Sequence, residues 1–281
     1  MDDFFIGWMP KAPAAYSKLV RKTLLFLGCF VVFAGFVLAI SQNKFSSANF
    51  EYGKLTTVEG IYFDSPVPSF KVMNGKDLFG HPSFITVPLI GYGKSGAGGL
   101  MKELAQEQQL SLNQRKLVLR GTLLYNDGKL LMQIDKNDSP LVKINRLDEA
   151  NYQPEKQDMG QQLVKGEIVD PKCFFGVMKP GQGKPHKDCA IRCILGGIPP
   201  VLRVEDKSGN ENYYLLVGPG GENMNEAVRD FVAEPVVVNA RVVRYDDWIV
   251  LYVAGSGIER TSYLRERFGN QISSCSIACK K

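Results

Sequence analysis

The chain reads LVLRGTLLYNDGKLLMQI over residues 117–134, two apolar, β-rich runs on either side of Asp127-Gly128. Asp-Gly between two such runs is a strong signal for a β-hairpin with a tight turn. A second stretch, VVVNARVVRYDDWIVLYV over residues 236–253, repeats the pattern about Asp246-Asp247. The two stretches match in pattern rather than in identity. We therefore expect them to be corresponding hairpins of an internally duplicated protein.

Three strand-like runs and one helical run precede each hairpin, in the same order. The order β-β-β-α-β-β is that of the OB-fold, a five-stranded Greek-key barrel. In the first copy we expect strands at residues 57–63, 69–73 and 83–90 and a helix at 100–108, and in the second copy strands at 163–169, 201–205 and 213–217 and a helix at 224–232.

These patterns predict a mainly β protein with two tandem OB-like five-stranded barrels, at residues 53–136 and 162–256. A polar linker with two prolines joins them at 137–161, and a C-terminal segment follows at 257–281. The copies differ between their first two strands, where the second copy carries an insertion at residues 170–200. OB-folds commonly bind ligands with the loop at this position, so the insertion lies where a ligand site is expected.

The N-terminal part of the chain contains an apolar segment, residues 23–41. The eighteen residues from Thr23 to Ile40 carry no charge, and a helix of that length rises about 27 Å, close to the apolar thickness of a bilayer. Four basic residues precede the segment and, by the positive-inside rule, keep residues 1–22 in the cytoplasm. We expect a single-pass anchor in a bacterial inner membrane, with both barrels in the periplasm. A cleaved signal peptide is the alternative, although its apolar core is normally only about 7–15 residues long.

The insertion places Cys173, His186, Cys189 and Cys193 at the spacing C-x12-H-x2-C-x3-C. Thiolates and imidazoles are the ligands that Zn²⁺ or Cu⁺ prefers, and four of them can close a tetrahedral structural site. If a helical turn begins at Lys187, the last three ligands share one face, since they stand at i, i+3 and i+7. These four residues are therefore a candidate zinc or copper site, ranked behind a disulfide that involves Cys173.

A disulfide is the competing interpretation of the same cysteines. Beyond the anchor lie five cysteines, the three of the insertion together with Cys275 and Cys279. In an oxidising compartment such cysteines usually pair, and a bridge from Cys173 would staple the long insertion. Because the number is odd, at least one thiol stays free, binds a metal or pairs between chains. No C-x-x-C sequence occurs, which excludes the thioredoxin-like motif and covalent haem attachment.

Other features of the sequence narrow the function further. The net charge of +5 is modest and spread along the chain, so nucleic-acid binding is not expected. The run from Pro88 to Ser95 ends in Gly-Lys-Ser like a phosphate-binding loop, but Pro88 stands where that motif needs a glycine. We expect His81 to be an exposed loop residue, and no nucleophile elbow accompanies His186. Nucleotide hydrolysis and serine-hydrolase chemistry are therefore not expected.

The insertion contains Asp-x-x-Cys at 170–173, His-x-x-Cys-Ala-x-x-Cys at 186–193 and Gly-Gly-Ile-Pro-Pro at 196–200. This pattern resembles that of small exported bacterial OB-like domains over about residues 163–253. The resemblance implies the fold and an extracytoplasmic compartment, and no activity. The architecture is also similar to the haem chaperone of cytochrome c maturation, an OB-like barrel on one N-terminal helix. This chain lacks a C-terminal histidine and tyrosine motif like that of the chaperone family, so haem carriage is not expected.

Three functions follow from the sequence, in order of preference. The first is a non-catalytic accessory or assembly subunit of an inner-membrane complex, whose partners are the lipid bilayer and other inner-membrane or periplasmic proteins. The second is a protein that binds or handles zinc or copper with the cysteine and histidine side chains of the insertion. The third is a thiol-dependent enzyme with Cys189 or Cys193 as nucleophile, activated by Lys187 and Arg192. The ligand, the partner and the pairing of the cysteines stay open at this point.

Overall fold

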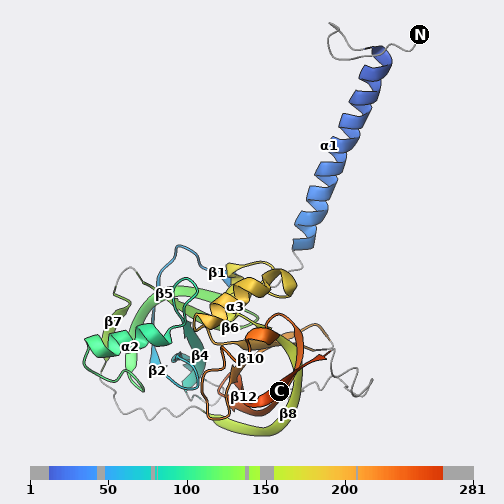
Figure 1. The fold of residues 1–281 in the computed structure, drawn as a ribbon. Helices are drawn as coiled ribbons and strands as arrows, with labels where there is room; N and C mark the ends of the chain where they lie inside the picture. Colours follow the sequence, from blue (N-terminus) through green and yellow to red (C-terminus); the bar gives the residue numbers. More distant parts are fainter. Residues whose placement is uncertain are drawn as a thin grey trace. The chain divides into compact units, whose positions relative to one another are not determined.

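The structure is a computed structural model that describes residues 13–42, 48–76, 80, 82–136, 139–145, 155–206 and 208–261 (Figure 1). The chain divides into two compact units, one up to residue 46 and one from residue 47 onward. The first unit contains a helix, and the second contains both barrels. His81, Cys275 and Cys279 lie outside the described residues.

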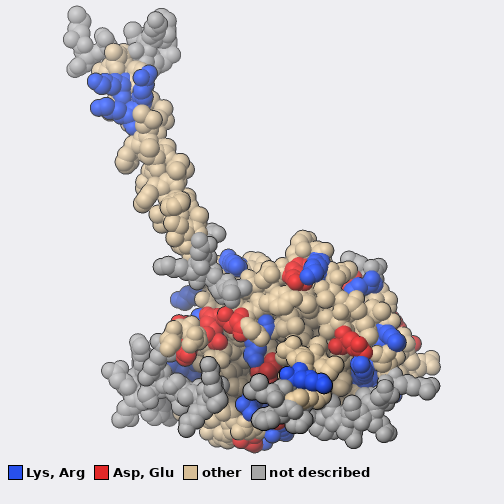
Figure 2. Space-filling model, turned by 180° about the vertical axis from the view of Figure 1, so that it is seen from behind, with Lys and Arg blue, Asp and Glu red and all other residues tan. Residues whose placement is uncertain are grey.

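The helix of the first unit is α1 (Ala14–Gln42), 29 residues long. Its mean hydropathy reaches 2.7, and its apolar side chains are exposed around the whole helix. A helix that is apolar all round and not buried by protein is suited to lipid. Within the described chain, α1 is the one helix long and apolar enough to cross a membrane. Its lysine and arginine side chains gather at its N-terminal end, as Figure 2 shows, and the rest of the helix carries no charge.

The first barrel is closed by five strands, and each pairs with two of the others. The parallel pair is β4–β6, and the remaining pairs are antiparallel. In chain order the elements are β2 (Thr56–Phe63), β3 (Ser69–Lys76), β4 (Pro82–Ile90), α2 (Gly98–Glu107), β5 (Lys116–Asn126) and β6 (Lys129–Ile134). Two further strands, β1 (Asn49–Phe50) and β7 (Leu141–Asn145), pair with β5.

The second barrel closes in the same order, and its parallel pair is β10–β12. Its strands are β8 (Lys156–Val169), β9 (Val201–Glu205), β10 (Glu211–Val217), β11 (Pro235–Tyr245) and β12 (Trp248–Arg260). Both barrels therefore have the strand order of an OB-fold. The expected fold class, two five-stranded barrels with one N-terminal apolar helix, is confirmed. The insertion between β8 and β9 contains η1 (Cys173–Val177), η2 (Lys184–His186) and α3 (Lys187–Leu195).

Two expected boundaries need correction. The helix expected at 224–232 is a series of turns followed by a short 3₁₀ helix, η3 (Arg229–Phe231). This segment is held from outside, because the buried Asn225 side chain donates hydrogen bonds to the carbonyls of Ile194 and Ile198. The linker expected at 137–161 contains β7 and the first residues of β8, since both segments find partner strands, in β5 and β11.

A shared apolar core joins the two barrels. Each barrel encloses a core of its own, and a third cluster lies between them. This third cluster combines Ile90, Leu124 and Leu131 of the first barrel with Trp248 and Val250 of the second. The indole Nε1 of Trp248 donates a hydrogen bond of 3.0 Å to the carbonyl of Thr86 across the junction. The barrels are thus packed as one body rather than strung on a linker.

The last hairpin of each barrel reaches into the other barrel. The β5–β6 turn consists of Asp127 and Gly128, both with positive φ (43° and 74°), and Asp127 accepts a hydrogen bond of 2.8 Å from the Tyr213 hydroxyl. The β11–β12 turn consists of Asp246 and Asp247. In the first barrel, the ammonium group of Lys71 donates to the Asp246 carboxylate. The ammonium group of Lys129 and the backbone N–H of Thr86 donate to the Asp247 carboxylate. The duplicated hairpins therefore also make reciprocal contacts.

The end of α3 lies directly against a loop of the first barrel, with backbone on backbone. The N–H of Gly96 donates to the carbonyl of Gly196 at 2.9 Å. A Cβ atom added at Gly96 would lie 2.0 Å from the Gly197 carbonyl oxygen, and one added at Gly196 would lie 1.8 Å from the Lys94 carbonyl oxygen. Only glycine fits this contact. We call it the glycine contact.

Gly96→Ala is expected to push the two segments apart, because backbone atoms cannot yield as a flexible side chain can. Overpacking of this kind costs about 1–3 kcal/mol or more, so the thermal unfolding temperature of the barrels should fall. Gly99→Ala is the matched control. A Cβ there meets nothing within 4 Å, and alanine in a helix is favoured over glycine by about 1 kcal/mol. Equal stability of the two variants would show that the glycine contact contributes little.

Glu234 connects the start of α3 to the end of β12, since its carboxylate binds both Lys187 and Arg260. Hydrogen bonds from Lys187 and then Arg260 hold the pKa of Glu234 below its ordinary value of 4.5. The stabilisation is therefore present above that value and is lost as the pH falls through the lowered pKa.

Glu234→Gln should lower the free energy of unfolding by about 1 kcal/mol or less at neutral pH, because the pairs are partly exposed. The difference from the parent chain should shrink below the ordinary carboxyl pKa, as denaturant curves across the acid range would measure. Glu226→Gln, at a carboxylate 79% exposed, is the control and should change stability little. A Glu234→Gln effect that persists unchanged in acid would contradict the ion-pair account.

Candidate metal centre

The first candidate ligands follow β8 directly, where the chain leaves the barrel wall. Asp170 is fully buried, and its carboxylate accepts the N–H of Lys172 at 2.9 Å. Its carbonyl accepts the N–H of Phe174 at 3.1 Å, at the start of η1, a single turn of π-helix. Asp170 thereby positions Cys173, the first residue of η1. The spacing Asp-x-x-Cys places both side chains at one end of the insertion.

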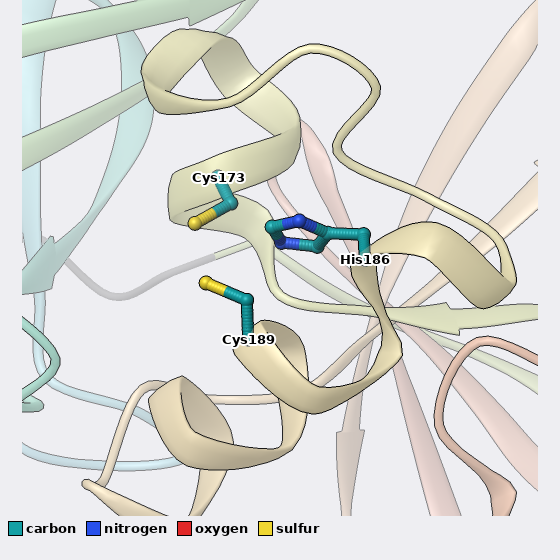
Figure 3. Close-up of side chains that lie close together, drawn as sticks. All are labelled: Cys173, His186 and Cys189. Carbon is teal, nitrogen blue, oxygen red and sulfur yellow. The ribbon is translucent and has the colours of Figure 1, made fainter.

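The remaining candidates come from η2 and α3. His186 ends η2 and precedes the first residue of α3, and Cys189 lies one turn further along. Figure 3 shows the imidazole edge of His186 facing the sulfur atoms of Cys173 and Cys189. One ligand atom from each of the three residues lies within 4.8 Å of the other two. We call Cys173, His186 and Cys189 the outer triad.

A second group shares one member with the first. Asp170, Cys173 and Cys193 also place one ligand atom each within 4.8 Å of one another. We call these three residues the inner triad. Cys193 follows Cys189 by four residues, so both thiols project from the same face of α3 one turn apart. The Cys173 sulfur thus belongs to both triads.

The four ligands expected from the sequence are therefore divided between two groups. The physical reason is the rise of the helix, because His186 and Cys193 are seven residues apart, about 10.5 Å along a helical axis. Ligand atoms on one ion must lie much closer together. The structure adds Asp170, which the sequence reasoning did not place among the ligands. Its signal was present in the Asp-x-x-Cys pattern, with the carboxylate three residues before the first thiol.

Burial distinguishes the residues of the centre. Asp170 is 0% exposed, Cys193 2%, His186 3% and Cys173 4%, whereas Cys189 is half-buried. Among the described residues, the Nε2 atom of His186 and the Oδ2 atom of Asp170 have no hydrogen-bond partner. An unsatisfied buried polar atom costs about 1–3 kcal/mol. A cation in the outer triad would satisfy the first atom, and a cation in the inner triad the second.

Burial favours the uncharged forms of the His186 imidazole and the Cys173 thiol. Burial lowers the pKa of His186, with Lys94 contributing and Asp170 opposing, so the imidazole is neutral and keeps a lone pair for a ligand bond. A hydrogen bond with Cys193, burial and the nearby Asp170 raise the pKa of the Cys173 thiol. Cys173 therefore keeps its proton, which a bound metal would have to displace.

Two lysines connect the candidate centre to the first barrel. The Lys172 ammonium is buried and donates to the carbonyls of Gly91, at 3.1 Å, and Gly93. Burial lowers the pKa of Lys172, although Asp170 and the thiols oppose this. Lys94, from the same glycine-rich loop, places its ammonium 3.4 Å from the Cys189 sulfur. Two cations thus stand beside the ligand cluster, one buried and one at its open side.

The cysteines carry no disulfide in the part of the chain that the structure describes. Cys29, Cys173, Cys189 and Cys193 are all free thiols. The disulfide expected to involve Cys173 is therefore not present. Cys173 and Cys193 instead lie in the shared apolar core between the barrels, which excludes water from the inner triad.

Comparison with known proteins does not add a family. No protein-family model matches the chain, and a search of curated proteins finds no significant match. The interpretation of the centre therefore rests on its own geometry.

Proposed function

We propose that the protein is a membrane-anchored metal-binding protein whose insertion holds a zinc or copper(I) ion. The observation that carries this proposal is the outer triad, three ligand atoms within 4.8 Å of one another. The buried Nε2 of His186, which has no hydrogen-bond partner among the described residues, supports it. Two thiolates and a neutral imidazole are the ligands that these d¹⁰ ions prefer.

The outer triad supports handling of an ion rather than permanent structural binding. Structural zinc sites are closed by four protein ligands, whereas three ligands leave a position open for water or an incoming group. Cys189 is half-buried, so the triad can be reached from solution. The rest of the centre is buried between the barrels, which protects the ion once it is bound.

Metal content and affinity test this function. The full chain, purified in detergent and reduced under anaerobic conditions, should bind Zn²⁺ or Cu⁺ in a defined stoichiometry. Cys173→Ser should weaken binding by at least about 100-fold, beyond the 10–100-fold cost of losing a residue that only orients a ligand. Elemental analysis and competition with a chromogenic chelator measure both quantities.

Cys29→Ser is the matched control, because the same substitution then falls on a free thiol of α1 that belongs to neither triad. It should leave affinity unchanged. A reduced parent chain that takes up neither ion would refute the proposal, as would equal losses in the two variants.

The orientation of the anchor is part of the same proposal. Lys18, Arg21 and Lys22 stand at the N-terminal end of α1, and the positive-inside rule keeps that end in the cytoplasm. Alkaline phosphatase fused behind residue 261 should then be active, because it folds only after export. An inactive fusion with normal expression would show that the orientation is the opposite one. Contact with other inner-membrane proteins, as an accessory subunit, stays a prediction from the sequence that cross-linking in native membranes checks.

A further inference from the structure

We infer that the insertion offers a single Zn²⁺ ion two successive positions, the outer triad and the inner triad, between which the ion moves without leaving the Cys173 sulfur. This inference rests on the proposed metal-binding function and goes beyond it, since it assigns a direction and a second binding position. The shared thiol and the unequal burial of the two triads carry the argument.

Burial sets the order in which the positions are reached. The outer triad contains the half-buried Cys189, whereas Asp170, Cys173 and Cys193 of the inner triad are all at most 4% exposed. An ion from solution therefore meets the outer triad first. The inner triad lies deeper, since Cys173 and Cys193 belong to the shared apolar core.

The helix supplies the step between the two positions. Cys189 and Cys193 stand one turn apart on α3, so an ion held by Cys173 can exchange one for the other over about 5–6 Å. Zn²⁺ has no geometric preference from d electrons, and its ligands exchange without an electronic penalty. At the same step His186 is replaced by Asp170, whose Oδ2 atom has no hydrogen-bond partner in the described chain.

Atoms and charges balance in this exchange. The Zn–S bond to Cys189 breaks and the one to Cys193 forms, while the Cys193 thiol proton passes to Cys189. The Zn–N bond to His186 breaks as the carboxylate of Asp170 binds. No electron is transferred, so neither an oxidant nor a reductant is needed.

Charge selects a divalent ion for the inner triad. When bound, two thiolates and the Asp170 carboxylate carry three negative charges. A divalent ion offsets more of this charge than a monovalent ion, which leaves more negative charge in the apolar core. Uncompensated buried charge is strongly unfavourable. Zn²⁺ therefore fits the inner triad better than Cu⁺.

Two single-thiol variants of the full chain separate the positions. Cys193→Ser removes a ligand from the inner triad alone, and Cys189→Ser removes one from the outer triad alone. We expect one Zn²⁺ per parent chain, released slowly to an excess of chelator. Cys193→Ser should still bind one ion but release it at least about tenfold faster. Cys189→Ser should keep the parent's final occupancy but both take up and release Zn²⁺ several-fold more slowly, because the ion passes the outer triad in both directions.

X-ray absorption at the zinc edge identifies the ligands at equilibrium. In the parent chain the ion should show two sulfur ligands and oxygen without imidazole scattering, and imidazole scattering should appear in Cys193→Ser. Three sulfurs together with imidazole in the parent chain would overturn the inference, as would two ions bound at once. In either case the protein still binds metal, so the proposed function survives. A parent chain without zinc affinity would remove both.

Folding of the variants is checked separately. Circular dichroism of the zinc-free chains should match the parent, because each substitution exchanges one atom. Cys29→Ser again serves as the control and should leave uptake, release and the absorption spectrum unchanged. Identical kinetics in Cys189→Ser and Cys193→Ser would show that the two thiols bind the ion together in one site.

Discussion

The glycine contact between Gly96 and Gly196 is the constraint on which the centre depends. Two backbones meet there with no room for a Cβ atom, so the loop of the first barrel and the end of α3 have one relative position. Because α3 carries Cys189 and Cys193, this contact also sets where those thiols lie. The loop that makes the contact supplies Lys94 and accepts the hydrogen bonds of Lys172. The centre is therefore a property of both barrels together.

Much of the fold could be predicted from the sequence because its strongest signals are local. Asp127-Gly128 adopts positive φ in a two-residue turn, which few other residue pairs do, so the β5–β6 hairpin follows from a few residues. The strands β1 and β7 could not be predicted from local sequence signals. They are two and five residues long, and they are strands only because they pair with the parts of β5 that β2 and β6 leave unpaired.

The sequence was enough to name most of the candidate ligands, but not to predict how they are arranged in space. Cys173, His186 and the α3 cysteines are close in sequence, so their shared chemistry is visible without a structure. Their division into two triads depends on the rise of α3 and on the turn that Asp170 begins, neither of which spacing alone conveys. Lys94 lies 95 residues from Cys189 and meets it only because the barrels dock.

The reciprocal hairpins also determine when the protein can be completed during synthesis. The first barrel leaves the ribosome early, yet the carboxylates that bind its Lys71 and Lys129 belong to Asp246 and Asp247, near the end of the chain. Before that hairpin is synthesised, the surface of the first barrel that packs against the second barrel is still exposed. It carries Lys71, which is buried in the complete structure, and the apolar side chains of the shared core. The β11–β12 hairpin also closes the second barrel. The side chains of both triads thus reach their final positions only after nearly all of the described chain has been made.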